Sequence, residues 1–159
     1  MIKKDIGNKV DVAVKYGVSG DANVKERSSC PISCALDILG DKWTLLILRD
    51  MIFHKKSTYT EFLNSGEKIA TNILADRLAI LEKVGIITKQ PHPEKKSKYL
   101  YKLTQKGIDL LPVLVEIGKW STTYGVFPDE ILSFMKIAES NTDSIIKELS
   151  SELNKKRKL

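Results

Sequence analysis

The sequence has little cysteine and histidine, and it lacks any long apolar run. Two cysteines and two histidines among 159 residues are too few for a cysteine-rich zinc module. Cys30 and Cys34 are separated by three residues and have no second pair nearby, so we expect neither a metal site nor a cofactor. The longest stretch of large apolar residues, Leu45–Leu48, is far too short to cross a bilayer.

Signals for export and for catalysis are missing as well. Polar and charged residues follow Met1 closely where a signal peptide would be apolar, so we expect a cytoplasmic protein with reduced thiols and no membrane partner. There is no Ser/His/Asp set and no glycine-rich phosphate loop. His54 and His92 lie in polar turns, where a solvated histidine is ordinary. No catalytic residue and no enzymatic activity is predicted.

The composition indicates a folded, soluble domain with an excess of positive charge. Hydrophobic residues make up 42% of the chain and charged residues 29%, which is typical of globular proteins. A chain of 159 residues suffices for one domain with a hydrophobic core. The formal net charge of +6 is compatible with a nucleic-acid partner, but it becomes an argument only where the charges cluster.

The stretch Thr58–Thr104 has the pattern of a helix-turn-helix unit followed by a two-stranded wing. Helical periodicity, a polar turn and two short alternating runs follow one another within this stretch. The fold class that they predict is mainly α with a small β wing (α+β), a winged helix-turn-helix. The predicted elements are a helix around Thr60–Asn64, a turn over Asn64–Lys68, a helix over 71–84, and strands over Ile86–Gln90 and Lys98–Leu103.

The second helix of this unit has one apolar and one polar face. Leu74, Leu78 and Leu81 recur at helical spacing and predict a buried stripe. Thr71 is the expected N-cap, and Gly85 is expected to stop the helix.

The opposite face of this helix carries small and polar residues that suit the major groove. Asn72 lies in the first turn, where a recognition helix contacts bases, and asparagine can pair with adenine through two hydrogen bonds. Arg77 flanks the apolar stripe, so it either fixes the helix to a nearby carboxylate or reaches a phosphate. The predicted DNA-contacting residues of the two helices are Thr58, Thr60, Thr71, Asn72, Ala75, Asp76, Arg77 and Lys83.

The turn between the two wing strands is basic. Glu94 is its only acidic residue, and a cationic hairpin tip suits the phosphate backbone or the minor groove. A solvated lysine-rich hairpin is the alternative interpretation. The predicted DNA-contacting residues of the wing are His92, Lys95, Lys96 and Lys98.

The segments before the unit are predicted to support it. Alternating residues over 10–18 indicate either a strand or a flexible arm. Pro31 opens a first helix, since proline is tolerated at the first helical position. Asp41 is expected to cap the next helix, Lys42–Ile52, which is apolar almost all round.

Helices are also expected after the unit. Thr104 is expected to cap one long helix from Gln105 to about Tyr124, with a bend at Pro112. So large an apolar stripe needs a partner, and a second copy of the chain is the predicted one. Further helices are expected from Pro128 and from Asn141, before a frayed basic tail. The predicted dimerisation residues are Leu110, Leu111, Leu114, Ile117 and Trp120.

These patterns divide the chain into three parts. Residues 1–29 form an amino-terminal arm, and residues 30–125 form the winged helix-turn-helix domain with its dimerisation helix. Residues 126–159 form a helical extension with a basic tail.

Several motifs of the middle part resemble the HxlR-type winged helix-turn-helix regulators. The resemblance extends from about residue 30 to residue 124 and implies a cytoplasmic, homodimeric transcription regulator related in fold to the MarR group. The carboxy-terminal helices depart from the usual pattern. The matching segments are Cys30–Ile32, Leu36–Arg49, Ile69–Leu78, Leu81–Glu82, Gly85–Ile87, Tyr99, Tyr101, Leu103–Thr104 and Gly107.

The resemblance also implies a sensing role for Cys30. In several members of this family the cysteine before the corresponding proline responds to oxidants or electrophiles. A thiol at a helix amino terminus faces unpaired N–H groups, which favour the thiolate. Cys34, one turn later, is either a resolving thiol or a small buried residue.

Two functions therefore compete. The first is a homodimeric regulator that binds a pseudo-palindromic double-stranded DNA operator, with half-sites about one helical turn or a multiple apart. The second is a protein-interaction module that retains the winged fold without specific DNA binding. Asp76 favours the second, because a carboxylate is repelled by phosphates, unless it accepts a hydrogen bond from cytosine.

Overall fold

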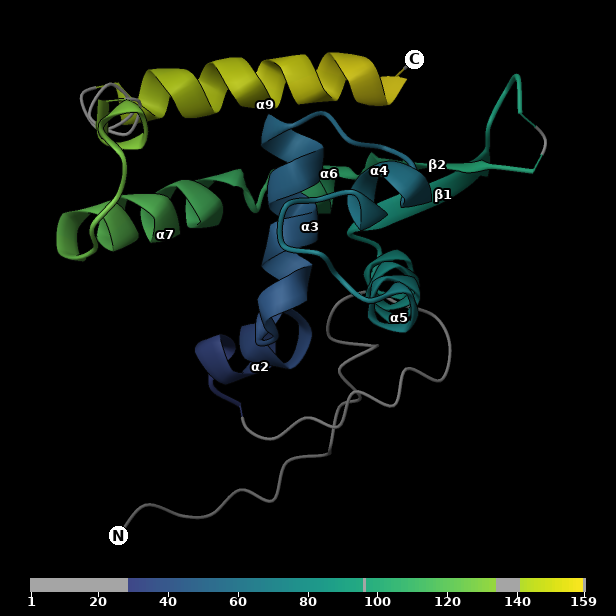
Figure 1. The fold of residues 1–159 in the computed structure, drawn as a ribbon, viewed down its shortest axis with the longest axis horizontal. Coiled ribbons are helices and arrows are strands. Elements are labelled where there is room, and N and C mark those ends of the chain that lie inside the picture. Colours follow the sequence, from purple (N-terminus) through teal and green to yellow (C-terminus); the bar gives the residue numbers. More distant parts are fainter. Residues whose placement is uncertain (1–28, 96, 134–140, 159) are drawn as a thin grey trace, which may run out of the picture.

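The computed structural model describes residues 29–95, 97–133 and 141–158. This part of the chain is mainly helical with one small antiparallel sheet, which confirms the predicted fold class (Figure 1). The alternating residues 10–18 and Lys96 lie outside the described residues. The elements are α2 (Pro31–Leu39), α3 (Lys42–Phe53), α4 (Tyr59–Leu63), α5 (Thr71–Lys83), β1 (Ile87–Pro91), β2 (Tyr99–Leu103), α6 (Gln105–Ile108), α7 (Leu111–Tyr124) and α9 (Thr142–Lys158).

Helix α3 is the axis around which the other elements pack (Figure 1). It begins as predicted, because the Asp41 carboxylate accepts hydrogen bonds from the N–H groups of Trp43 at 2.8 Å and Thr44 at 3.0 Å. Leu48 and Ile52 are fully buried in the core. A side chain of this size contributes about 2 kcal/mol when it leaves water, so α3 supplies much of the apolar support for the helix-turn-helix unit.

Helices α4 and α5 form the expected helix-turn-helix. A capping box starts α4. The Glu61 N–H donates to the Thr58 hydroxyl oxygen, and the Thr58 N–H donates to the Glu61 carboxylate. The prediction that Thr71 caps α5 is wrong: Ala70 is the N-cap and no side chain caps the helix. Gly85 follows the end of α5 with a φ of +71°, where glycine carries no steric cost.

The wing is a two-stranded antiparallel hairpin, as predicted. Its first strand is displaced by one residue from the prediction, and its second strand begins one residue later but ends at Leu103 as expected. Ile87 lies opposite Leu103, and Pro91 lies opposite Tyr99. An isolated bridge joins Thr58 to Leu100, and the Tyr101 N–H donates to the Ser57 carbonyl at 2.7 Å. The start of α4 is thereby tied to the wing.

The prediction of a single long helix after the wing is wrong, because two helices, α6 and α7, occupy this segment. Thr104 caps α6 by accepting from the Gly107 N–H, as expected. Helix α6 ends at Ile108, however, and α7 begins at Leu111. Pro112 explains the break, since it has no N–H for the carbonyl of residue 108 and its ring would clash there. Proline fits the first turn of α7 instead.

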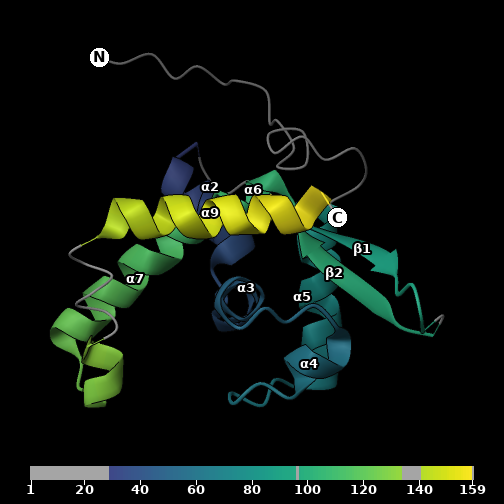
Figure 2. The same ribbon diagram turned by 90° about the horizontal axis from the view of Figure 1, so that it is seen from above.

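The carboxy-terminal extension forms a long helix across the domain. Helix α9 continues to Lys158, so the expected frayed tail is helical up to that residue. Leu153 joins the core, and Figure 2 shows α9 running over α3 and α6. Residues 129–133 are helical, as expected after Pro128. Within the described residues, no helix is both long and apolar enough to cross a membrane.

Candidate nucleic-acid interface

Helix α5 presents one face to the core and the other to solvent. Leu74, Leu78 and Leu81 are at most 2% exposed and anchor the helix. The opposite face is free of bulky side chains, so another surface can approach it closely. The predicted contact residues on this face, all exposed, are Thr71, Asn72, Ala75 and Asp76.

Hydrogen bonds fix both ends of α5. At the start, the Tyr59 hydroxyl donates to the Thr71 carbonyl at 2.8 Å, which connects α4 directly to α5. At the end, the Lys106 ammonium donates to the Val84 carbonyl at 2.7 Å. The Thr104 hydroxyl donates to the Gly85 carbonyl at 2.7 Å. The position and orientation of the exposed face are therefore fixed at both ends of α5.

Arg77 connects α5 to α3. Its guanidinium donates to the Asp41 carboxylate at 3.1 Å and to the Asp76 carboxylate at 2.5 Å. Two roles were predicted for Arg77, and these bonds match the first of them, which is to fix the helix to a nearby carboxylate. The guanidinium also offsets part of the negative charge of Asp76, which reduces the repulsion expected between that carboxylate and a phosphate.

The remaining residues predicted on the two helices differ in their surroundings. The Thr58 hydroxyl is engaged in the capping box of α4 and is half-buried, so the structure gives it a capping role. Thr60 and Lys83 are exposed on α4 and α5.

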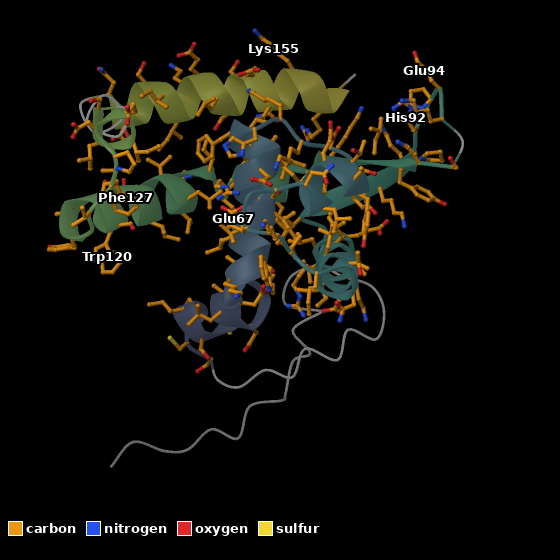
Figure 3. All side chains as sticks on the ribbon, viewed as in Figure 1. Glu67, His92, Glu94, Trp120, Phe127 and Lys155 are labelled. Carbon is orange, nitrogen blue, oxygen red and sulfur yellow. The ribbon has the colours of Figure 1, made fainter. Side chains whose placement is uncertain are left out.

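The wing tip carries its basic residues in solvent. Lys95 and Lys98 are exposed, and the Lys98 N–H donates to the Lys95 carbonyl at 2.8 Å to close the turn. His92 is half-buried, and its Nδ1 accepts from the Glu94 N–H at 3.2 Å. Figure 3 shows these two labelled residues at the far end of the hairpin. The tip therefore extends a positive surface away from the domain.

Sequence reasoning missed a group of charged side chains at the end of α3. We call Asp50 and the four residues that contact its carboxylate, Arg49, His54, Lys56 and Ser65, the Asp50 cluster. The Asp50 carboxylate is only 2% exposed yet accepts from Arg49 at 2.6 Å and from Lys56 at 2.8 Å. It also contacts His54 Nδ1 at 3.0 Å and accepts from the Ser65 hydroxyl.

The Asp50 cluster holds the turn between α4 and α5. Ser65 lies in this turn, and Lys56 donates to it at 2.6 Å. Arg49 extends the cluster by donating to both carboxylate oxygens of Glu67, at 2.5 and 2.9 Å. Paired donation by arginine fixes geometry as well as charge. Figure 3 shows Glu67 beside α3, near the middle of the domain.

The surroundings of Asp50 and Glu67 favour the ionised form of both carboxylates. Burial alone would raise the pKa of Asp50, but hydrogen bonds from Lys56, Ser65, Arg49 and His54 outweigh it and hold that pKa far below its usual range. The bond from Arg49 lowers the pKa of Glu67.

Cys30 and Cys34 differ in exposure. Cys30 is exposed at the start of α2, where the backbone N–H groups of Ser33 and Ile32 lower the pKa of its thiol. Cys34 is 1% exposed, which matches a small buried residue better than a resolving thiol.

The predicted dimerisation residues are only partly available on the surface. Leu111 is fully buried within the core of this chain, and Leu110 and Leu114 pack against that core. Ile117 is 44% exposed and Trp120 is 68% exposed. Figure 3 shows Trp120 at the outer side of α7. The exposed apolar surface of α7 thus lies toward its carboxy-terminal half.

Comparisons with known proteins agree with this geometry. The model of the HxlR-like helix-turn-helix family matches residues 38–127. The uncharacterized HTH-type transcriptional regulator YdeP of Bacillus subtilis is 32% identical over 110 residues, which cover 69% of this chain and 84% of YdeP. An uncharacterized HTH-type transcriptional regulator of Methanothermobacter thermautotrophicus is 30% identical over 109 residues, covering 69% of this chain and 82% of the relative.

Two solved structures are similar in fold. The crystal structure of PA1607, a transcription-factor candidate, superposes with a TM-score of 0.58 at 41% identity and covers 65% of this chain and 70% of PA1607. The reduced form of the transcriptional regulator YodB from B. subtilis superposes with a TM-score of 0.50 at 29% identity. It covers 61% of this chain and 95% of YodB.

Proposed function

This chain belongs to the HxlR-like helix-turn-helix family of transcriptional regulators, which are not enzymes, and we propose that it binds DNA as a homodimer with α5 in the major groove. The observation that carries the proposal is the division of α5 into a buried leucine stripe and an exposed face of short side chains. Asn72 is the proposed base-reading residue, because its amide is exposed in the first turn of α5. Thr71 and Ala75 flank it.

The wing supplies the proposed phosphate contacts. Lys95 and Lys98 are exposed at its tip, and neither is held against a carboxylate by an ion pair in the described part of the chain. Cations of this kind strengthen binding to any sequence and make it dependent on salt. Sequence preference would then come from α5, and most of the salt dependence from the wing.

A homodimer would let two copies of α5 read successive major grooves. The exposed apolar residues Ile117 and Trp120 of α7 are the proposed centre of its interface. A two-fold dimer matches a pseudo-palindromic operator, with half-sites about 10 base pairs or a multiple apart.

A redox response through Cys30 is part of the proposal. The exposed Cys30 thiol, whose pKa is lowered, would lose its proton, and the thiolate would attack hydrogen peroxide; the S–O bond forms as the O–O bond breaks, giving Cys–SOH and hydroxide. The new polar group at the start of α2 would alter the packing of α2 on α3 and, through α3, the helix-turn-helix turn.

Selection of duplexes from a random library by the full-length protein tests the DNA proposal. We expect enrichment of a pseudo-palindrome, and size-exclusion chromatography with light scattering should give two protomers per duplex. A library that shows no enrichment, together with binding that does not change with salt, would contradict the proposal and favour a protein-interaction module.

The redox proposal is tested on the selected duplex by fluorescence anisotropy. Hydrogen peroxide should weaken binding of the native protein by about tenfold, within the usual range of allosteric coupling. Cys30→Ser should bind equally well with and without peroxide, whereas Cys34→Ala should behave like the native protein. Equal peroxide sensitivity of Cys30→Ser would exclude Cys30 as the sensor.

A further inference from the structure

A small pocket lies between α9, β2 and the connection from α3 to α4. Its volume is about 220 Å³. Figure 1 shows the carboxy-terminal half of α9 above the upper end of α3 and the base of the wing, and Figure 2 agrees. Helix α9 lies beyond residues 38–127, the region that the family model matches. The pocket therefore depends on the part of this chain that departs from the family pattern.

The pocket has an apolar floor and a basic rim. The floor consists of buried core residues and the rim of more exposed cations, and Ser57 also lines the pocket. The floor is lined by Met51, Tyr101, Leu103 and Leu153, and the rim by Lys55, Lys56, Lys102 and Arg157.

Two of the four cations already have carboxylate partners. Lys55 donates to both oxygens of Glu152 at 2.9 Å, and Lys56 donates to Asp50. Lys102 and Arg157 have no carboxylate within ion-pair distance in the described part of the chain. Both line the pocket, and they come from different elements, Lys102 from β2 and Arg157 from α9. The lining of the pocket therefore has an excess of positive charge.

We propose that this pocket binds a compact organic anion, whose carboxylate lies between Lys102 and Arg157 and whose apolar body contacts the floor. The volume suits such a molecule, since an apolar cavity of about 150 Å³ accepts benzene. DNA phosphate is a poorer occupant, because α9 and α5 lie on opposite sides of the wing (Figure 1). A duplex bound to α5 would face away from the pocket.

The pocket is connected to the DNA-reading unit. Lys56 lines the pocket and also donates to Asp50 and to Ser65 in the helix-turn-helix turn. Lys102 belongs to a wing strand. A bound anion could thus change DNA affinity, and that consequence rests on the proposed function. Binding of the anion itself does not rest on the proposed function, so it is measured without DNA. A failure of anion binding is therefore distinguishable from a failure of DNA binding.

Isothermal titration calorimetry of the full-length protein with 4-ethylbenzoate tests the site. For a ligand of this size we expect a Kd between about 0.1 and 1 mM. The isosteric neutral 4-ethylbenzamide should bind at least about tenfold more weakly, because it cannot pair with the cations. Acetate and inorganic phosphate, which lack the apolar body, should also bind more weakly.

Matched variants locate the site. Lys102→Gln and Arg157→Gln should each weaken binding of 4-ethylbenzoate by about tenfold. Lys155→Gln removes the same charge from α9 outside the pocket lining and should leave binding unchanged; Figure 3 shows Lys155 on the outer side of α9. Circular dichroism should confirm that all three fold.

Four results would overturn the proposal. They are no binding of 4-ethylbenzoate up to about 10 mM, equal binding of the amide, equal binding of inorganic phosphate, and unchanged affinity in both Lys102→Gln and Arg157→Gln.

Discussion

The outward face of α5 consists of short side chains in solvent, whereas the Asp50 cluster consists of polar and charged side chains gathered around one buried carboxylate. Thr71, Asn72 and Ala75 have few contacts within the chain, so their replacement should change stability little. Asp50 has four polar partners and almost no exposure. The comparison teaches that the surface proposed to read DNA and the network that positions it can be changed separately.

The largest expected effect is on the Asp50 cluster. Asp50→Asn removes a buried charge and leaves Arg49 and Lys56 without their shared partner, so the free energy of unfolding should fall by roughly 3 kcal/mol. Urea denaturation followed by circular dichroism measures the loss. Asp76→Asn is the matched control on the exposed face of α5 and should change stability by less than about 0.5 kcal/mol. Equal effects of the two variants would remove the distinction between the regions.

Acid should weaken the same cluster. Because the pKa of Asp50 is lower in the folded state, the unfolded state binds more protons as the pH falls below the unfolded value of about 3.9. The stabilisation is present above that value and is lost progressively below it. Urea denaturation from pH 5 to pH 2 should therefore show a steeper loss for the native protein than for Asp50→Asn. Parallel curves would mean that Asp50 does not carry this pH dependence.

Arg77 links the exposed face of α5 to the start of α3, outside the Asp50 cluster. Its ion pair with Asp41 is partly exposed, so a double-mutant cycle of Arg77→Gln and Asp41→Asn should give a coupling of about 1 kcal/mol or less. Asparagine preserves the N-cap of α3, which limits the change to the charge. If Arg77 only positions α5, the DNA affinity of Arg77→Gln, measured by anisotropy, should fall because α5 is held less firmly, and its dependence on salt should not change. A reduced salt slope would instead identify Arg77 as a phosphate contact.

The smallest effect is expected at the wing tip. Lys95→Ala should weaken binding to selected and random duplexes equally and should reduce the slope of log K against log salt by about 0.9 if it contacts one phosphate. Stability should remain unchanged, since Lys95 is exposed. Anisotropy titrations at several salt concentrations provide the measurement. A loss confined to the selected duplex would assign base reading to the wing.

The sequence predicted the exposed region well because its signals are local. The spacing of Leu74, Leu78 and Leu81, and the stop at Gly85, depend only on residues within one helix. The Asp41 cap is equally local and was also predicted.

The features that were missed depend on distant contacts. Asp50 lies in an apolar helix, and nothing near it shows that Lys56 and Ser65 meet its carboxylate after the chain turns back. Leu111 was predicted at the dimer interface, but it is buried in the core of this chain, because α7 starts at Leu111 after the break that follows α6. Pro112 is itself a local signal for that break, because proline is favoured in the first turn of a helix.

The most direct test of the central claim compares Asn72→Ala on two duplexes, the selected operator and a scrambled sequence of equal composition. Anisotropy should show a loss of about 2 kcal/mol, roughly thirtyfold, on the operator and none on the scrambled duplex. Asn154→Ala, in α9 on the other side of the wing, is the matched control and should bind both duplexes like the native protein. An equal loss on both duplexes, or no loss on either, would contradict the claim that the exposed face of α5 reads bases.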